Sequence, residues 1–226
     1  MKQKVFGILA VLLIYSQLSV IGQITQPVEQ LSALQVTDRL LVSVILGDRN
    51  EMIIEGEEAE HVQAVFKDGD LRLKMAPGHN LQGQETMVTL YTSSLSKITV
   101  RKGAVVNVEQ HALKTDALSL TAREGGKIRA LIEAVGVDAS ANTGAIIDVL
   151  GTAKKVNVSS GTGAAFYGKD LQSEIAYARA SGGGKVEISA TTSADVVARL
   201  GGVIDVYGDP DQKHDKTILG GEIRFQ

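Results

Sequence analysis

The sequence predicts an all-β fold, with β-helix-like parallel coils stacked in residues 85–226 and antiparallel hairpins in residues 23–84. Three observations predict it. Glycine turns recur at a nearly constant spacing, short strands with alternating apolar residues lie between them, and the chain has 24 glycines but only 3 prolines. A fixed period near 20 residues is typical of stacked repeats, in which each coil buries its apolar face against the next. We therefore expect residues 23–226 to form a single domain.

Five glycine turns between about residues 118 and 207 mark the repeat. Counted from the last glycine of each turn, the spacings are 18, 19, 21 and 18 residues. Glycine adopts a positive φ without steric cost and lets backbones approach closely, so these turns suit the corners of a coil. The turns are Gly125-Gly126, Thr143-Gly144, Thr162-Gly163, Gly183-Gly184 and Gly201-Gly202.

An apolar column emerges when the repeats are aligned on these turns. Alternate side chains of a strand share a face, so we expect the residue two places after each last glycine to point into a common interior. Asp148, two places further along its repeat, breaks the next column and predicts a bulge or a shifted register there. A meandering β-sandwich is the alternative, but the recurring glycine turns favour the β-helix. The inward column is Ile128, Ile146, Ala165, Val186 and Ile204.

The region before residue 85 is less regular, and we expect antiparallel hairpins in it. An Asp-Gly turn between two alternating segments is a strong hairpin signal, and Gly47–Asn50 is a second polar turn. One helical turn is expected at Glu57–His61 and a loop at Ala76–Gln84. The expected strand pairs are Leu40–Ile45 with Met52–Glu55, and Val62–Phe66 with Leu71–Met75.

Residues 1–22 have the pattern of a signal peptide, with Lys2 and Lys4 before the apolar segment Val5–Tyr15. That segment is shorter than the ~20 residues of a membrane-spanning helix, and no other candidate span follows. Without the two lysines, 21 basic residues face 26 acidic ones, which argues against nucleic-acid partners. Cysteine is absent, which excludes thiol chemistry. We predict an exported protein, periplasmic or at the cell surface.

Carboxylates on the repeats raise the alternative of an enzyme that acts on polysaccharides. Acid/base catalysis needs two carboxylates close to one substrate bond. The candidates are dispersed along the sequence, and alternation places Asp205 towards solvent, so we predict no catalytic residue. The candidates are Asp138, Asp148, Asp195 and Asp205, with Arg129, Lys154 and Lys155 as basic partners.

Cofactor and metal signals are weak. The glycine-rich segments at 159–163 and 181–185 lack the spacing of a nucleophile elbow or a phosphate loop. The acidic loop Asp209–Asp215 lacks the regular spacing of a calcium loop, so calcium binding there stays open. We predict no cofactor and no metal, because no two of the four histidines have ligand spacing; they are His61, His79, His111 and His214.

Several segments resemble one bacterial family, described as putative auto-transporter adhesin, head GIN domain. The resemblance covers about Leu31–Gly208, and similar proteins are common in Bacteroidetes. It implies a right-handed β-helix-like fold and an adhesin-like surface role, and it supplies no catalytic residues. The segments that carry it are LSALQVTDRLLVSVILGDRNEMIIEGEE, VFKDGDLRLKM, SGTGAAFYG and SGGGKVEISA.

These observations predict an exported, non-enzymatic interaction module of the cell envelope or surface, with an unknown protein or glycan as partner. The alternatives are a polysaccharide-active enzyme, and an envelope scaffold or stress component that binds a protein partner. The last alternative requires an apolar patch at the end of the stack, near Ile223 and Phe225. We expect the N-terminal hairpins and Asp215–Gln226 to cap the two ends, since an incomplete cap would permit self-association.

Overall fold

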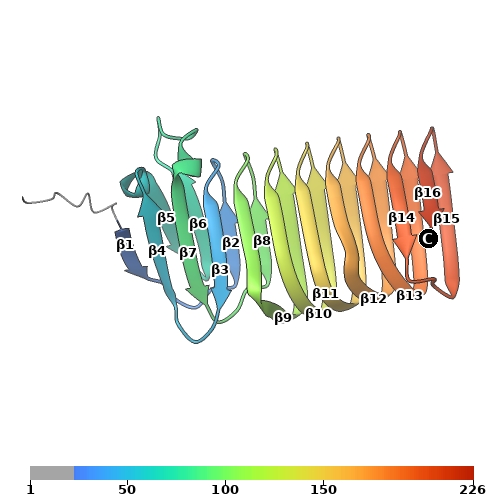
Figure 1. Ribbon diagram of the computed structural model, residues 1–226, viewed down its shortest axis with the longest axis horizontal. Coiled ribbons are helices and arrows are strands. Elements are labelled where there is room, and N and C mark those ends of the chain that lie inside the picture. Colours follow the sequence, from blue (N-terminus) through green and yellow to red (C-terminus); the bar gives the residue numbers. More distant parts are fainter. Residues whose placement is uncertain (1–22) are drawn as a thin grey trace, which may run out of the picture.

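The computed structural model describes residues 23–226, which form a rod of stacked β-coils (Figure 1). The predicted β-solenoid is thereby confirmed, and its handedness stays a prediction. Each central coil is one long bent strand, parallel to the next coil, with its first half on one face of the rod and its second half on the other. These strands are β9 (Val105–Arg123), β10 (Lys127–Asn142), β11 (Ile146–Gly161), β12 (Ala165–Ser181) and β13 (Lys185–Arg199).

Two-residue turns join successive coils along one edge of the rod, as Figure 1 shows. Both turn residues have positive φ, for example 53° at Thr143 and 68° at Gly144, which is the pattern of a type I′ turn. The turns also bond to one another, because Gly125 N–H donates to the Thr143 carbonyl (3.0 Å) and Gly144 N–H to that of Thr162 (3.1 Å). The edge is therefore a continuous ladder of turns.

The core column differs from the prediction in two coils. The residues in register are Ile128, Ile147, Phe166, Val186 and Ile204, and all are buried. Ile146 and Ala165 instead lie on the half-exposed side of their strands. The prediction was wrong for these two coils because it counted from the last glycine of each turn. Ala145 and Ala164 occupy the position at which the other coils have that last glycine, so the count began one residue too early. Asp148 is thus no misfit, since it sits on the regular outward side of β11.

The N-terminal region is a mixture of parallel and antiparallel strands. On the first face, β7 (Thr86–Thr92) lies between β3 (Leu41–Leu46) and β4 (Glu51–Gly56), and it is parallel to β3 and antiparallel to β4. The predicted hairpin between β3 and β4 is therefore wrong. β7, which is distant in the sequence, takes the place beside β3 that was predicted for β4, because the apolar side chains of β7 extend the same core. β1 (Gln23–Pro27) adds antiparallel to β4 at the edge.

The second face continues through the strand order β8, β2, β6, β5. β2 (Ala33–Val36) is parallel to both β8 (Lys97–Val100) and β6 (Asp70–Met75). β6 and β5 (Val62–Lys67) form the antiparallel hairpin predicted at the Asp-Gly turn, which is confirmed. The predicted helical turn is also confirmed, as the 3₁₀ segment η1 (Ala59–His61), and a second one, η2 (Gly83–Glu85), ends the predicted loop.

The stack ends with one complete coil and the start of another. The complete coil is β14 (Val203–Tyr207) with β15 (Gln212–Ile218), and the next begins with β16 (Glu222–Phe225). β15 pairs with β13 and β16 with β14, both in parallel, so residues 215–226 continue the stack instead of forming a separate cap. On β15 the inward row reads Lys213, Asp215 and Thr217, in register with Ala194, Val196 and Ala198 of β13. Inward charges of this kind protect an open strand edge from further pairing.

One continuous apolar core runs through the rod from Leu31 to Val206. Neither short helix of residues 23–226 has the length or the apolar character needed to cross a membrane. The predicted signal peptide, residues 1–22, lies outside the described residues.

Candidate functional site

The four candidate carboxylates fall into two outward rows on different faces of the rod. Asp138 and Asp195 share a row with Asn157 and Tyr177 between them. Asp148 and Asp205 likewise stand three strands apart, which is about 14 Å at the ~4.8 Å spacing of neighbouring strands. Catalytic carboxylate pairs of glycosidases lie within about 10 Å of each other. The structure therefore brings no two of these four together.

Asp205 is only 5% exposed, so the expectation that it faces solvent is wrong. It is on the outward side of β14, but neighbouring long side chains cover it. Arg224 of β16 places its Nε 3.2 Å from the carboxylate. Glu187 of β13 lies in register with Asp205 on the neighbouring strand. It accepts a hydrogen bond from the Lys185 ammonium (2.6 Å), and this bond raises the Lys185 pKa above its usual value. Each of the two adjacent acids thus lies beside a basic group, and Arg224 is shared with Glu222, which lies 3.1 Å from the same Nε.

The predicted basic residues lie in different surroundings. Arg129 lies between two acids, with its Nε 3.2 Å from Glu109 and 3.5 Å from Asp148. Lys154 lines an open hollow of about 630 Å³ at the bend of the coils, together with Glu133 and Glu174. These arrangements balance charge along the rod, because oppositely charged side chains on neighbouring strands attract one another.

A different group on the second face does converge, and we call it the Tyr177 patch: Lys155, Asn157, Tyr177, Arg179 and Asp195. These side chains line a shallow hollow of about 270 Å³. Tyr177 is 40% exposed, and the Lys155 ammonium lies 4.9 Å from the centre of its ring. Asn157 donates a hydrogen bond to Asp138 (3.0 Å), which anchors the edge of the patch.

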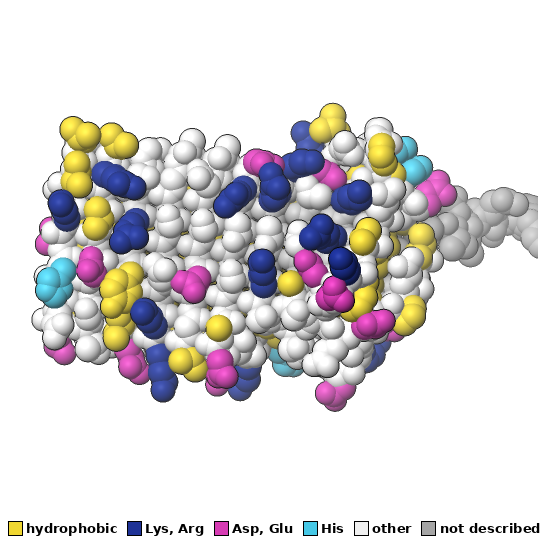
Figure 2. Space-filling view, turned by 180° about the vertical axis from the view of Figure 1, so that it is seen from behind, with side chains coloured by type: hydrophobic (Ala, Val, Ile, Leu, Met, Phe, Trp, Pro, Cys, Tyr) yellow, Lys and Arg dark blue, Asp and Glu magenta, His cyan; other side chains and the backbone are white. Residues whose placement is uncertain are grey.

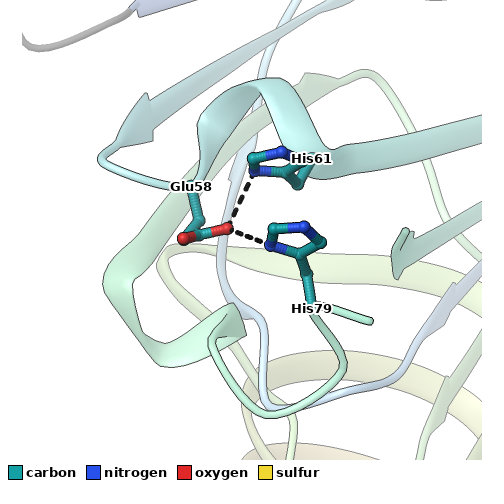
Figure 3. A group of neighbouring side chains, drawn as sticks. All are labelled: Glu58, His61 and His79. Atoms are coloured by element: carbon teal, nitrogen blue, oxygen red, sulfur yellow. Dashed lines mark hydrogen bonds and ion pairs between the residues drawn. The ribbon is translucent and has the colours of Figure 1, made fainter. Parts of the chain in front are cut away.

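A second convergence lies at the N-terminal end, where the loop 76–82 protrudes beyond the row of turns (Figure 1). Figure 3 shows that the Nδ1 atoms of His61 and His79 both point at one carboxylate oxygen of Glu58. His79 Nδ1 is hydrogen-bonded to Glu58 Oε2 at 2.7 Å, and His61 Nδ1 lies 2.9 Å from the same atom. The rings stack with centroids 3.6 Å apart and planes 12° apart. All three side chains are half-buried.

Sequence reasoning missed this cluster, since the four histidines are dispersed along the chain. Glu58 and His61 are three residues apart in a predicted helical turn, and that spacing places two side chains on one side. This was the available signal for half of the cluster. His79 lies in the loop after β6, and its approach depends on the folding of the hairpin, which brings the loop back over η1: the Ala76 N–H donates to the His61 carbonyl (2.8 Å).

The acidic loop after β14 contains an internal ion pair. Lys213 donates a hydrogen bond to Asp209 at 2.7 Å, and this bond lowers the pKa of the exposed Asp209 carboxyl. The same ammonium lies 5.3 Å from the centre of the Phe225 ring. Lys213 therefore links the loop to Phe225 of β16.

The end of the stack is apolar in a different place from the one expected. Ile223 and Phe225 are partly buried and pack against the core. Exposed apolar side chains are instead found on the last two turns, at Leu200 (55%), Leu219 (75%) and the neighbouring Ile218 (37%). Figure 2 shows apolar side chains gathered at the corner of this end, whereas the middle of the face carries mostly small or polar side chains.

The fold and its surface define a β-solenoid that presents flat lateral faces, with side-chain clusters at the Tyr177 patch and at the N-terminal end. The chain belongs to the family described as putative auto-transporter adhesin, head GIN domain, whose model matches residues 30–210. The resemblance noted in the sequence is therefore confirmed. No protein among those with curated functions matches the chain.

Solved structures with the same fold include crystal structures described as those of putative adhesins. One from Bacteroides fragilis has a TM-score of 0.85 at 17% identity, covering 92% of this chain and 98% of that one. One from Parabacteroides merdae has a TM-score of 0.72 at 14% identity, covering 91% and 96%. A protein from Parabacteroides distasonis described as a putative lipid binding protein has a TM-score of 0.62 at 14% identity, covering 91% and 96%. At these identities the likeness concerns the fold.

Proposed function

We propose that this protein is an exported, non-enzymatic interaction module that binds a protein or glycan of the cell envelope or surface. Membership of the adhesin-described family supports this role, as does the predicted signal peptide at residues 1–22. The rod offers long, flat faces built from paired backbone, and such a scaffold holds exposed side chains at fixed positions. Fixed positions favour binding, because little conformational freedom is lost when a partner docks.

The observation that carries the proposal is the Tyr177 patch. Tyrosine and arginine are enriched among the residues that dominate binding interfaces, and Tyr177 and Arg179 stand side by side on one strand face. Tyrosine offers apolar area and a hydroxyl at a low entropy cost. Lys155 and Asp195 add charges of both signs at the rim. The surroundings on neighbouring coils are small serines, including Ser140, Ser159 and Ser193, which let a partner approach closely.

The same patch does not suit hydrolysis of a polysaccharide. Its carboxylate, Asp195, stands three strands from Asp138, and Asn157 holds Asp138 in place. No second described carboxylate lines the hollow. A single acid with two cations can orient a partner but lacks the acid and base pair that glycoside cleavage requires. Recognition without turnover is therefore the role that this geometry supports.

Binding of the purified chain, residues 23–226, to an isolated envelope fraction of the host tests the proposal. We expect saturable binding, and we expect Tyr177→Ser with Arg179→Ala to weaken it by about 30-fold or more, since a single interface hot spot contributes roughly 2 kcal/mol. Leu219→Ser, on an exposed turn, is the matched control and should bind like the wild type. Treating the envelope with protease or with periodate distinguishes a protein partner from a glycan.

One binding result would contradict the proposed contact surface, and a second test locates the protein. Saturable binding that survives the double substitution but disappears in Leu219→Ser would move the contact surface to the coil end. Protease treatment of intact cells is the second test, because an exported surface protein should be shaved. Protection in intact cells, with digestion only after the outer membrane is opened, would restrict the role to the periplasm.

A further inference from the structure

We propose that Glu58, His61 and His79 form a binding site for a divalent transition-metal ion of the zinc class, which fastens the loop 76–82 to the η1 segment. The proposal rests on three ligand atoms, two imidazole nitrogens and one carboxylate oxygen, that lie within 4.8 Å of one another. It is independent of the proposed surface role, since the cluster belongs to the N-terminal end of the rod and the Tyr177 patch to its central coils.

The distances fit an ion once the two imidazole rings rotate out of their near-parallel stack, because the lone pair of each Nδ1 lies in the plane of its ring. The two nitrogens lie 2.9 and 2.7 Å from Glu58 Oε2. Zinc binds nitrogen at about 2.0–2.1 Å and carboxylate oxygen at about 2.0–2.2 Å, so tetrahedral ligand atoms stand roughly 3.3 Å apart. The carboxylate must therefore move away from each imidazole by less than about 1 Å. The backbone need not move, because all three ligands are side chains that are only half-buried.

One ligand atom has no other satisfactory partner. His61 Nδ1 is shielded from solvent and makes no hydrogen bond of good geometry, although it lies 2.9 Å from the Glu58 carboxylate. Buried polar atoms in folded proteins are normally satisfied, and each exception calls for an explanation. The near-parallel stack of the two rings directs both Nδ1 atoms to the same side of the cluster (Figure 3). An ion placed there would satisfy His61, His79 and Glu58 together.

The donor set selects the class of ion. Imidazole nitrogen suits zinc, nickel and copper, whereas calcium and magnesium prefer oxygen ligands. Two histidines and one glutamate form a known zinc ligand set, which leaves one tetrahedral position for water or for a ligand from outside. The ion would join Glu58 and His61 of one segment to His79 of another. A backbone hydrogen bond from Ala76 to His61 already holds these segments together.

Titration of the metal-stripped chain, residues 23–226, with Zn²⁺ tests the site by calorimetry and by competition with a chromogenic chelator. We expect one saturable equivalent that persists in excess Mg²⁺ and Ca²⁺. His61→Gln and His79→Gln should each weaken binding on the order of 100-fold, because loss of a partner that merely orients a ligand already weakens metal binding by up to about that factor. His214→Gln, on exposed β15 at the other end of the rod, is the matched control and should bind like the wild type.

Two further readouts keep the test decisive if a variant folds poorly. Co²⁺ bound to the wild type should show the intense visible absorption of a tetrahedral, nitrogen-ligated ion, and Zn²⁺ should raise the melting temperature of the wild type and of His214→Gln. The spectrum of hydrated Co²⁺ alone would overturn the proposal. So would the absence of saturable Zn²⁺ binding, or equal binding by the wild type and by folded His61→Gln and His79→Gln.

Discussion

The central coils and the N-terminal region use the same two faces and the same core, but they are connected differently. From β9 to β13 each strand pairs with the strand that follows it in sequence. In the N-terminal region β2 pairs with β6 and β8, and β7 pairs with β3 and β4, so the chain leaves the stack and returns. The regular coils produce uniform faces, whereas the irregular region brings distant side chains such as His61 and His79 together.

This difference explains where each kind of site is found. A regular coil repeats its neighbour, so a cluster on its face must be assembled from residues in register, as in the Tyr177 patch. Between β6 and β7, by contrast, the loop 76–82 and η2 stand where the other coils have a two-residue turn. Long loops on a rigid scaffold are common places for binding residues. The Glu58, His61 and His79 cluster lies at this expanded corner.

The core of the regular coils should be the most sensitive part of the chain. Phe166 is fully buried, and we expect Phe166→Ala to lower the free energy of unfolding by about 3–5 kcal/mol. Val65, which is 49% exposed on β5, is the comparison in the N-terminal region, and Val65→Ala should cost within about 0.5 kcal/mol. Urea unfolding of both variants measures the difference. Similar costs at the two positions would contradict the proposed core.

A substitution in a positive-φ turn should destabilise the chain, but by less than the loss of a core side chain. Gly144 has φ +68°, and a methyl group added to it would meet open space, so Gly144→Ala introduces backbone strain without a clash, worth about 1–2 kcal/mol. Gly47 also has open space but no positive φ, and Gly47→Ala should be neutral or stabilise by roughly 0.4–1 kcal/mol. Thermal unfolding distinguishes them. If Gly47→Ala were the more destabilising variant, the turn assignment would be wrong.

Self-association through the end of the stack should be limited by the inward charges of β15. Lys213→Ala with Asp215→Val restores the apolar residues found one coil earlier, and we expect it to strengthen self-association relative to the wild type. His214→Val with Lys216→Ala changes the outward side of the same strand and is the matched control. Sedimentation velocity over a range of concentrations measures the association. Equal association of the two double variants would contradict the proposal that the inward charges of β15 protect this edge.

The smallest effect concerns Lys185 on the first face. Its hydrogen bond with Glu187 raises its pKa above the unfolded value of 10.5, so the stabilisation is fully present below that pH and is lost as pH rises through the folded pKa. Lys185 is 43% exposed, so solvent screening limits the contribution to within about 1 kcal/mol. Melting temperatures of the wild type and Glu187→Gln should converge as pH rises through the folded pKa of Lys185. A constant difference across this range would contradict the coupling.

The fold could be predicted where it repeats locally. The positive-φ turns, the alternation and the Asp-Gly hairpin are short-range signals, and the structure follows them. The predicted register of β11 and β12 was wrong because Ala145 and Ala164 replace glycine after the turn. The pairing of β7 between β3 and β4 could not be predicted, since nothing local specifies a partner more than 40 residues away in the sequence.

The sites depended even more on long-range contacts. The carboxylate rows could be placed on the surface, but the burial of Asp205 depends on Arg224 from the next coil. Tyr177 could be assigned to an outward position, whereas its neighbours Lys155 and Asp195 come from flanking coils whose register contains bulges. His79 reaches His61 only after the hairpin folds. Sequence spacing therefore described single strands well and clusters poorly.

Hydrogen–deuterium exchange with and without Zn²⁺ tests most directly the contrast between a rigid stack and an irregular region that holds a metal clip. Exchange reports the local opening of backbone hydrogen bonds. We predict slow exchange at the turn and strand amides of residues 105–207 in both conditions, and faster exchange at residues 57–82 that slows when Zn²⁺ is added. Fast exchange throughout the coils, or a Zn²⁺ effect spread evenly along the rod, would contradict this account.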